Sequence, residues 1–205
     1  MDHLVFAVPD LAEAIELLER QTGVRPRFGG RHPGRGTHNA LLSLGGRQYL
    51  EIIALDATQG AAADALMFPD LIGLSHPRLI AWAVAVASVA ASAQRAKALG
   101  IDCVGPLAGA RTEADGLRLS WKTLRPRGPG SAGLPFFIEW GEAVAHPAET
   151  SPQGCVLSSF LIEHPEPDTL RRLLAGLGLD AVVSPGASVR LSARLATPLG
   201  AVEFA

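Results

Sequence analysis

The stretch HLVFAV at residues 3–8 is a short apolar strand that leads directly into an amphipathic helical pattern over residues 10–21. This pattern begins at an aspartate, a residue type that caps helix N-termini, and it stops at a glycine. The unit closes on QYLEII at residues 48–53, a second apolar strand with Glu51 at its centre. Strands that flank an amphipathic helix in this way are typical of an α+β module.

The same pattern recurs about 80 residues later in the chain. LIAWAVAV at residues 79–86 leads through a helical pattern over 88–99 to FFIEW at 136–140, with Glu139 near its centre. Each unit is too short to bury both faces of a sheet alone, so the two are expected to pack together. The sequence thus predicts an α+β protein in which two tandem βαβββ modules form a curled sheet around a cleft. A third, partial βαβ unit follows them.

Turn-forming stretches rich in Gly, Ala and Pro divide the chain into these units. The predicted boundaries are a first βαβββ module at 1–56, a linker at 57–78, a second module at 79–141, a linker at 142–154, and a partial third module at 155–205 packed on the others.

The composition excludes some classes of molecule as binding partners. The 205 residues carry a formal net charge of −2 and no basic run, which argues against nucleic acid or an anionic membrane as a partner. The two cysteines form no metal-type CxxC pair and no disulfide framework, which is typical of a reducing compartment. The longest apolar stretch is far shorter than the ~20 residues that a membrane helix needs. We therefore expect a cytoplasmic protein with a small-molecule ligand.

Alternation along the strands predicts which side chains face the cleft. If the hairpin turns at the dipeptide Gly45-Gly46, then His38, Tyr49 and Glu51 share one face. In the second module the bulky strand residues are expected to meet the helix, which leaves Ala81, Ala83 and Ala85 to line an open cleft.

The repeat aligns Val8 with Val86, and this places His3 opposite Ala81. The predicted cavity therefore contains His3 and Glu51 from the first module and Glu139 from the second. A carboxylate inside an apolar strand is costly to bury unless it is paired or bound to a metal. Two such glutamates at corresponding places suggest two half-sites that face one cavity.

The opening DHLV (residues 2–5), the segment GTHN (36–39) and the strand YLEII (49–53) resemble the vicinal oxygen chelate superfamily, and within it the glyoxalase-like domain branch. This superfamily includes glyoxalase I, extradiol dioxygenases and bleomycin-resistance proteins. The resemblance covers about residues 2 to 141. It implies that a divalent metal (Zn, Mn, Fe, Ni or Co) is held by side chains of the first and last strand of each module. Those positions are His3, Glu51 and Glu139, with Ala81 as the departure from the pattern.

Two functions follow from the resemblance. One is a metal-dependent lyase, isomerase or dioxygenase that acts on a small oxygenated substrate, with Glu139 or Glu51 as the catalytic base. The other is a metal-free protein that binds and sequesters a small ligand, in which His3 is an ordinary residue and the glutamates are hydrogen-bonded core acids. Such proteins often dimerise, so a homodimer is compatible with either function.

Further side chains are candidates for the cavity wall. His38 could be a metal ligand or a substrate donor, or it could bond to neighbouring backbone. Tyr49 and Trp121 are predicted to line the substrate cavity, although Trp121 has an equally good interpretation as a residue outside it. By alternation, Trp140 should point away. His32, with Arg31 and Arg35, could bind an anionic substrate at the cavity mouth, but this Arg- and Gly-rich stretch is predicted to be a solvated loop.

Overall fold

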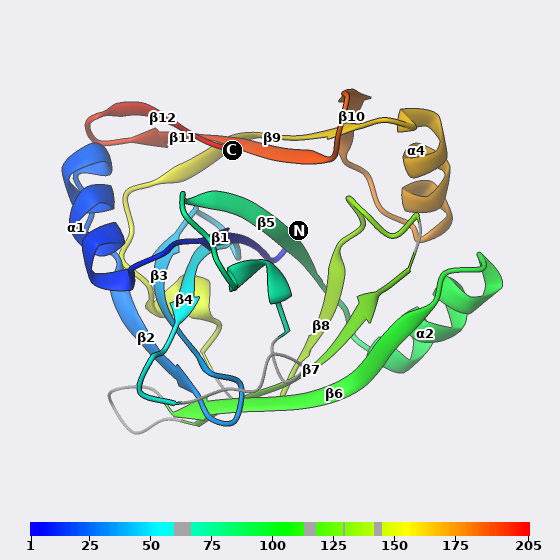
Figure 1. Ribbon diagram of the computed structural model, residues 1–205, viewed down its shortest axis with the longest axis horizontal. Helices are drawn as coiled ribbons and strands as arrows, with labels where there is room; N and C mark the ends of the chain where they lie inside the picture. Colours follow the sequence, from blue (N-terminus) through cyan, green and yellow to red (C-terminus); the bar gives the residue numbers. More distant parts are fainter. Residues whose placement is uncertain (60–66, 113–117, 129, 142–144) are drawn as a thin grey trace.

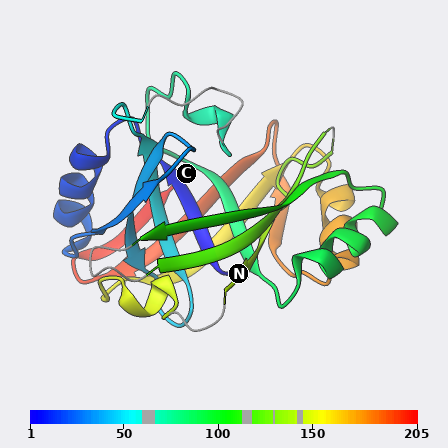
Figure 2. The same ribbon diagram turned by 90° about the horizontal axis from the view of Figure 1, so that it is seen from below.

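The computed structural model describes residues 1–59, 67–112, 118–128, 130–141 and 145–205. Eight strands form one sheet in the order β2-β3-β4-β1-β5-β8-β7-β6, and four strands form a second sheet in the order β10-β9-β11-β12. The larger sheet curls around its concave side, as Figures 1 and 2 show. The predicted fold class, α+β with a curled sheet built from two modules, is confirmed.

The first module supplies one half of the large sheet. Its elements are β1 (His3–Ala7), α1 (Leu11–Thr22), β2 (Arg27–His32), β3 (Thr37–Ser43) and β4 (Tyr49–Leu55). The Asp10 side chain accepts a hydrogen bond from the backbone N–H of Glu13 at 2.9 Å, and Gly23 ends the helix with φ 75°. Strand β4 then returns beside β1 and runs parallel to it.

The second module repeats this order in the other half. Its elements are β5 (Arg78–Ala85), α2 (Val89–Ala98), β6 (Cys103–Thr112), β7 (Arg118–Pro126) and β8 (Phe136–Trp140). Strand β5 pairs antiparallel with β1 and joins the halves. The linker between the modules contains a short 3-10 helix, η2 (Pro69–Leu71), while its residues 60–66 lie outside the described part.

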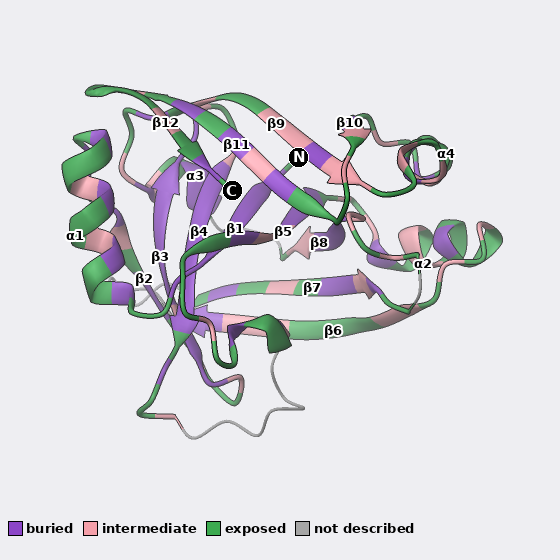
Figure 3. Cartoon of the chain, turned by 45° about the horizontal axis from the view of Figure 1, so that its top comes forward, coloured by how far each residue is buried: buried purple, intermediate pink, exposed green. Residues whose placement is uncertain are grey.

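The third unit covers the convex face of the large sheet (Figure 1). A short helix, α3 (Pro147–Thr150), precedes β9 (Val156–His164), α4 (Pro167–Gly176), β10 (Val182–Pro185), β11 (Arg190–Thr197) and β12 (Gly200–Phe204). Ring centroids lie 5.0 Å apart for Phe6 and Phe204, and 5.4 Å apart for Trp82 and Phe160. All three units therefore share one apolar core, whose buried central strands are purple in Figure 3. No helix within the described ranges is long and apolar enough to cross a membrane.

The hairpin between β3 and β4 differs from the predicted one by a single residue. The Leu44 N–H donates to the Gln48 carbonyl at 2.9 Å, so the loop has three residues rather than two, and Glu51 pairs with Leu41. One extra residue exchanges the two faces of a strand. His38 therefore lies on the convex side, with its ring 6.3 Å from that of Phe28, and the prediction that it lines the cavity is wrong. Asn39 takes the cavity-facing place.

The alanine face of β5 does lie on the concave side, but its centre is filled, whereas Ala85 at the end of the strand is exposed. Ala83 is fully buried in a cluster that includes Phe68 from the linker and Phe136 from β8. The two phenylalanine rings meet edge to face at 6.0 Å. These side chains occupy part of the concave face, and the cavity that remains is lined by residues of both modules and of the linker.

Candidate functional site

A cavity of about 170 Å³ lies on the concave side of the large sheet. Its ionisable lining consists of His3, His32, Arg35, Tyr49, Glu51 and Arg111. Its aromatic wall consists of Tyr49, Phe68, Trp121, Phe136 and Trp140. A cavity of about 150 Å³ is enough for benzene, so this space suits one small molecule or the end of a larger one.

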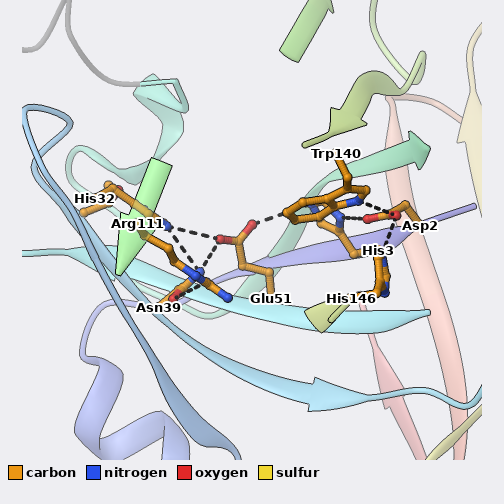
Figure 4. Close-up of polar contacts among 9 residues, drawn as sticks. Asp2, His3, His32, Asn39, Glu51, Arg111, Trp140 and His146 are labelled. Atoms are coloured by element: carbon orange, nitrogen blue, oxygen red, sulfur yellow. Dashed lines mark hydrogen bonds and ion pairs between the residues drawn. The ribbon is translucent and has the colours of Figure 1, made fainter. Parts of the chain in front are cut away.

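The pairing of β1 with β4 brings His3 and Glu51 together. His3 is opposite Tyr49 in the parallel register, and Val5 is opposite Glu51. Residues two apart share a face, so both Tyr49 and Glu51 project beside His3. The Tyr49 ring stacks on the imidazole at 4.5 Å, and His3 Nε2 lies 3.7 Å from Glu51 Oε2. Figure 4 shows His3 and Glu51 in the same polar network.

A buried carboxylate holds the other side of the His3 ring. Asp2 Oδ1 lies 2.6 Å from His3 Nδ1, and Asp2 Oδ2 lies 2.9 Å from His146 Nε2 and 3.0 Å from Trp140 Nε1. Burial alone would raise the pKa of Asp2, but the hydrogen bonds from His146, His3 and Trp140 outweigh it and hold this pKa well below its usual range. Asp2 is therefore a buried, ionised carboxylate.

The hydrogen-bond partners of His146 and His3 show which nitrogen of each ring carries the proton. The backbone N–H of Ala148 donates to His146 Nδ1 at 3.2 Å, so His146 carries its proton on Nε2 and donates it to Asp2. The ionised Asp2 likewise needs a donor at Oδ1, and His3 supplies it through Nδ1–H. His3 Nε2 is consequently the nitrogen that faces Glu51 and the cavity. An imidazole oriented by a carboxylate in this way is suited to accept or release a proton at Nε2.

Asn39 fixes the other oxygen of Glu51. Arg111 Nη1 donates to Asn39 Oδ1 at 3.1 Å. Because the arginine side chain has only donors, the Asn39 atom that faces it must be the oxygen, and the amide nitrogen Nδ2 points away from Arg111. Asn39 Nδ2 donates to Glu51 Oε1 at 2.6 Å. Arg111 is buried, with 6% of its surface exposed. The order Arg111, Asn39, Glu51 is visible in Figure 4.

His32 completes this side of the site, and the expectation of a solvated loop was wrong for it. Its Nε2 lies 3.3 Å from Asn39 Nδ2 and accepts the second amide hydrogen, while its Nδ1 lies 2.8 Å from Thr37 Oγ1. Burial lowers the pKa of His32, the Glu51 charge opposes this, and the nearby Arg111 adds to the lowering. His32 is therefore a neutral imidazole whose hydrogen bonds brace Asn39.

Tyr49 and Trp121 both lie at the cavity wall. Burial raises the pKa of Tyr49 well above its ordinary value, and the charges of Asp2 and Glu51 raise it further, so its hydroxyl stays protonated. The Trp121 ring is 5.9 Å from that of Trp140 and 6.3 Å from that of His32. A role for either residue in substrate binding stays a prediction.

Glu139 does not face the cavity. The Val8 N–H donates to the Ile53 carbonyl and the Val86 N–H to the Ile138 carbonyl, so Ile138 is the counterpart of Ile53. Counting back two residues, the counterpart of Glu51 is Phe136. The prediction aligned the two glutamates instead, an error of three residues, and an odd shift exchanges the faces of a strand. Trp140 consequently lines the cavity, which corrects the prediction that it points away.

Glu139 has a structural place on the other face of β8. Its Oε2 accepts a hydrogen bond from the Val89 N–H at 2.9 Å, at the start of α2, and its Oε1 lies 2.8 Å from Lys122 Nζ. The bond from Lys122 is the main reason that the pKa of Glu139 is lowered. A carboxylate at a helix N-terminus is favourable, because it satisfies a free N–H group.

Glu139→Gln should therefore leave ligand binding unchanged and lower the melting temperature slightly, since the amide keeps an acceptor for Val89 but loses the charge. Thermal unfolding and ligand titration on the same sample measure both effects. Loss of binding with an unchanged melting temperature would instead place Glu139 in the functional site.

The donor set does not fit a resident metal ion. The four positions at which the superfamily resemblance places ligands hold His3, Glu51, Ala81 and Phe136, and the last two have no donor atoms. In addition, Asn39 occupies Glu51 Oε1. Within the described ranges, no group of three or more His, Cys, Asp or Glu side chains could hold a metal ion. The predicted site of His3, Glu51 and Glu139 is not formed.

Comparisons with known proteins agree with this fold. A family model described as a glyoxalase-like domain matches residues 1–178, so the chain belongs to the glyoxalase-like domain family. No match was found among curated proteins.

Solved structures match this chain at low sequence identity. A hypothetical protein from Staphylococcus aureus matches with a TM-score of 0.66 and 15% identity, covering 99% of this chain and 83% of that one. Methylmalonyl-CoA epimerase from Mycobacterium tuberculosis matches with a TM-score of 0.47 and 21% identity, covering 70% and 87%. The Streptomyces coelicolor epimerase, in complex with 2-nitronate-propionyl-CoA, gives 0.47 and 17%, covering 70% and 97%.

Several residues of the site were not anticipated from the sequence. Asp2 stands out in the sequence only as part of the DHLV motif, although its place next to a candidate histidine and an apolar strand was a signal for a buried partner. The sequence contained no comparable signal for Asn39 or Arg111, because their roles depend on the strand register. His146 lies 144 positions from Asp2, and no local pattern links them.

Proposed function

We propose that this protein is an enzyme that transfers a proton on a small oxygenated molecule, using His3 and Glu51 rather than a bound metal. The observation that carries this proposal is the placement of the His3 ring. One nitrogen is held by the ionised Asp2, and the other opens toward Glu51 and the cavity. This is lyase or isomerase chemistry of the kind that the sequence predicted, without the metal.

In the proposed reaction, the His3–Glu51 pair removes a proton from the carbon next to a carbonyl group. The electron pair of the broken C–H bond moves into the carbonyl, which becomes an enolate. Return of a proton to the same or a neighbouring atom gives the product. Asp2 stabilises the imidazolium that forms transiently, as a buried carboxylate does for a histidine base.

Hydrogen-bond donors near the pair can stabilise the enolate oxygen. The Tyr49 hydroxyl remains protonated, and the buried Arg111 guanidinium contributes positive charge at the cavity. Donors that are fixed before the reaction are effective because they need no reorganisation as the charge develops. The aromatic wall of Trp121, Trp140 and Phe136 limits the access of water to the intermediate.

The direct experiment is solvent isotope exchange. Small enolisable probes (pyruvate, 2-oxobutyrate, dihydroxyacetone and acetylacetone) are incubated with the enzyme in D2O, and deuterium uptake next to the carbonyl is followed by proton NMR. We expect at least one probe to exchange faster than in a buffer control. No acceleration for any probe that binds in the cavity would contradict the proposal.

A metal-free binding protein is the second candidate. The aromatic share of the cavity wall favours it, since such walls hold flat, apolar ligands without any chemistry. The same NMR samples distinguish the two functions: this candidate predicts binding without exchange, unaffected by His3→Gln. The expectations of a cytoplasmic location and of a homodimer stay predictions.

A further inference from the structure

Strand β2 carries an irregularity directly beside the acid–base site. Phe28 pairs with Ala40, but Gly30 pairs with Asn39, so Gly29 is an extra residue in the ladder between β2 and β3. Such β-bulges often lie next to active sites, where they redirect a side chain on one of the strands. Gly30 has φ 144°, in a region that strongly favours glycine.

The space beside Gly29 is occupied by the side chains that hold Glu51. A Cβ atom at this position would lie 2.5 Å from Asn39 Oδ1, 3.0 Å from Arg111 Nη1 and 3.0 Å from Leu41 Cγ. The first two atoms are the partners in the 3.1 Å hydrogen bond between Arg111 and Asn39. A side chain larger than a hydrogen atom therefore requires Asn39 Oδ1 or the β2 backbone to shift, and either shift disturbs that bond.

The disturbed bond is the first in a series that ends at the proposed base pair. Arg111 fixes which way the Asn39 amide faces, and this amide donates to Glu51 Oε1. Holding Oε1 leaves Oε2 as the oxygen that faces His3 Nε2 at 3.7 Å. Misplacement of a reacting group by about 1 Å can cost ~10²-fold in rate.

We propose that Gly29 is a positioning residue: its missing side chain allows Arg111 and Asn39 to meet, and through Asn39 it orients Glu51 toward His3. This inference rests on the proposed function for its effect on rate. The effect of a substitution at Gly29 on the substrate-free protein does not rest on the proposed function, because it depends only on the contacts of Asn39.

The test is Gly29→Ala, measured in two ways. The isotope-exchange rate should fall by about 10²-fold at saturating probe, with a smaller change in KM, because orientation rather than binding is lost. In the substrate-free protein, NMR titration of the histidine rings should show the pKa of His32 rising toward its ordinary value of 6.5. Displacing Asn39 admits water and moves Arg111 away from His32, whose pKa is also influenced by the charges of Glu51 and Arg35 on the cavity side and of His38 on the opposite face.

A matched control is Gly34→Ala in the turn between β2 and β3. No atom lies within 4 Å of the added Cβ, and φ is 73°, so this change strains the backbone without touching Asn39. It should lower stability while leaving the exchange rate and the His32 titration as in the wild type. If Gly34→Ala changes the His32 titration as much as Gly29→Ala does, the effect is general loosening and the proposal is overturned.

The double variant Gly29→Ala/Asn39→Ala separates positioning from a general structural role. If Gly29 acts through Asn39, adding Gly29→Ala to Asn39→Ala should cause no further loss of rate and no further change in the His32 titration. Independent, additive effects would overturn the proposal. Should Gly29→Ala alone fail to fold, the double variant is expected to recover the fold, because the new methyl group takes the place of the removed amide. Failure of the double variant to fold would also overturn it.

The two proposals fail in different ways. If the wild type catalyses no exchange, the proposed function is wrong, while the His32 titrations of the same variants still decide the role of Gly29. If the wild type is active and Gly29→Ala leaves both measurements unchanged, only the positioning role is wrong.

Discussion

His3→Gln is expected to lower the isotope-exchange rate by about 10²–10⁴-fold, the usual contribution of a general base. Glutamine keeps a donor for Asp2 but cannot accept a proton at the position of Nε2. Glu51→Gln should have a similar effect, since its amide retains an acceptor for Asn39 and loses the ability to take up a proton. Both rates are measured by NMR with the probe that the wild type exchanges fastest.

The control for both variants is Glu139→Gln, which removes a carboxylate from the opposite face of β8. It should keep the wild-type rate. An active His3→Gln enzyme with normal kinetics would show that the imidazole is not the base, and equal losses in all three variants would indicate damage to the fold instead.

Asp2→Asn should reduce the free energy of unfolding by about 3 kcal/mol, because it leaves ring N–H groups facing an amide in the interior. Both partner histidines are 2% exposed at their side chains, so water cannot replace the lost acceptor. A chain of this size loses about 2–4 °C of melting temperature per kcal/mol, which gives a fall of about 6–12 °C. Urea unfolding and thermal melts at neutral pH measure the effect.

The loss of stability caused by Asp2→Asn should also depend on pH. The pKa of Asp2 is lower in the folded than in the unfolded protein, so its contribution is fully present above the unfolded value of about 3.9 and is lost as the pH falls further. The difference in stability between the wild type and Asp2→Asn should therefore be constant from pH 7 to 5 and shrink toward pH 2. A constant difference down to pH 2 would contradict the assignment of Asp2 as a buried, ionised carboxylate.

The sequence predicted the modules because their main signals are local. The apolar strand at 3–8, the capping residue Asp10 and the stop at Gly23 lie within one continuous stretch. The same order of apolar strand, amphipathic helix and apolar strand recurs in the second module. The third unit also followed from local patterns. What no local pattern indicated was that this unit would form its own sheet and cover the convex face.

The site was predicted only in part. The sheet face on which a strand side chain lies depends on the exact number of residues in the preceding loop and on the exact alignment of the repeat. His3 and Glu51 were placed together by alternation within two well-defined strands. His38 was assigned to the wrong face by one loop residue, and Glu139 by a misaligned repeat. Neither error was visible in composition or apolar periodicity, because both alternatives keep the strand apolar. The contacts of Asp2 with His146 and of Arg111 with Asn39 depend on tertiary packing between distant segments.

Elemental analysis combined with the exchange assay tests most directly whether His3 and Glu51 act without a bound metal. The protein is purified without added metal, its Zn, Mn, Fe, Ni and Co contents are measured, and exchange is compared before and after treatment with EDTA. If His3 and Glu51 act without a metal, the protein should contain far less than one metal ion per chain, and EDTA should leave the exchange rate unchanged. One ion per chain, with activity lost on its removal and restored on its return, would contradict this prediction.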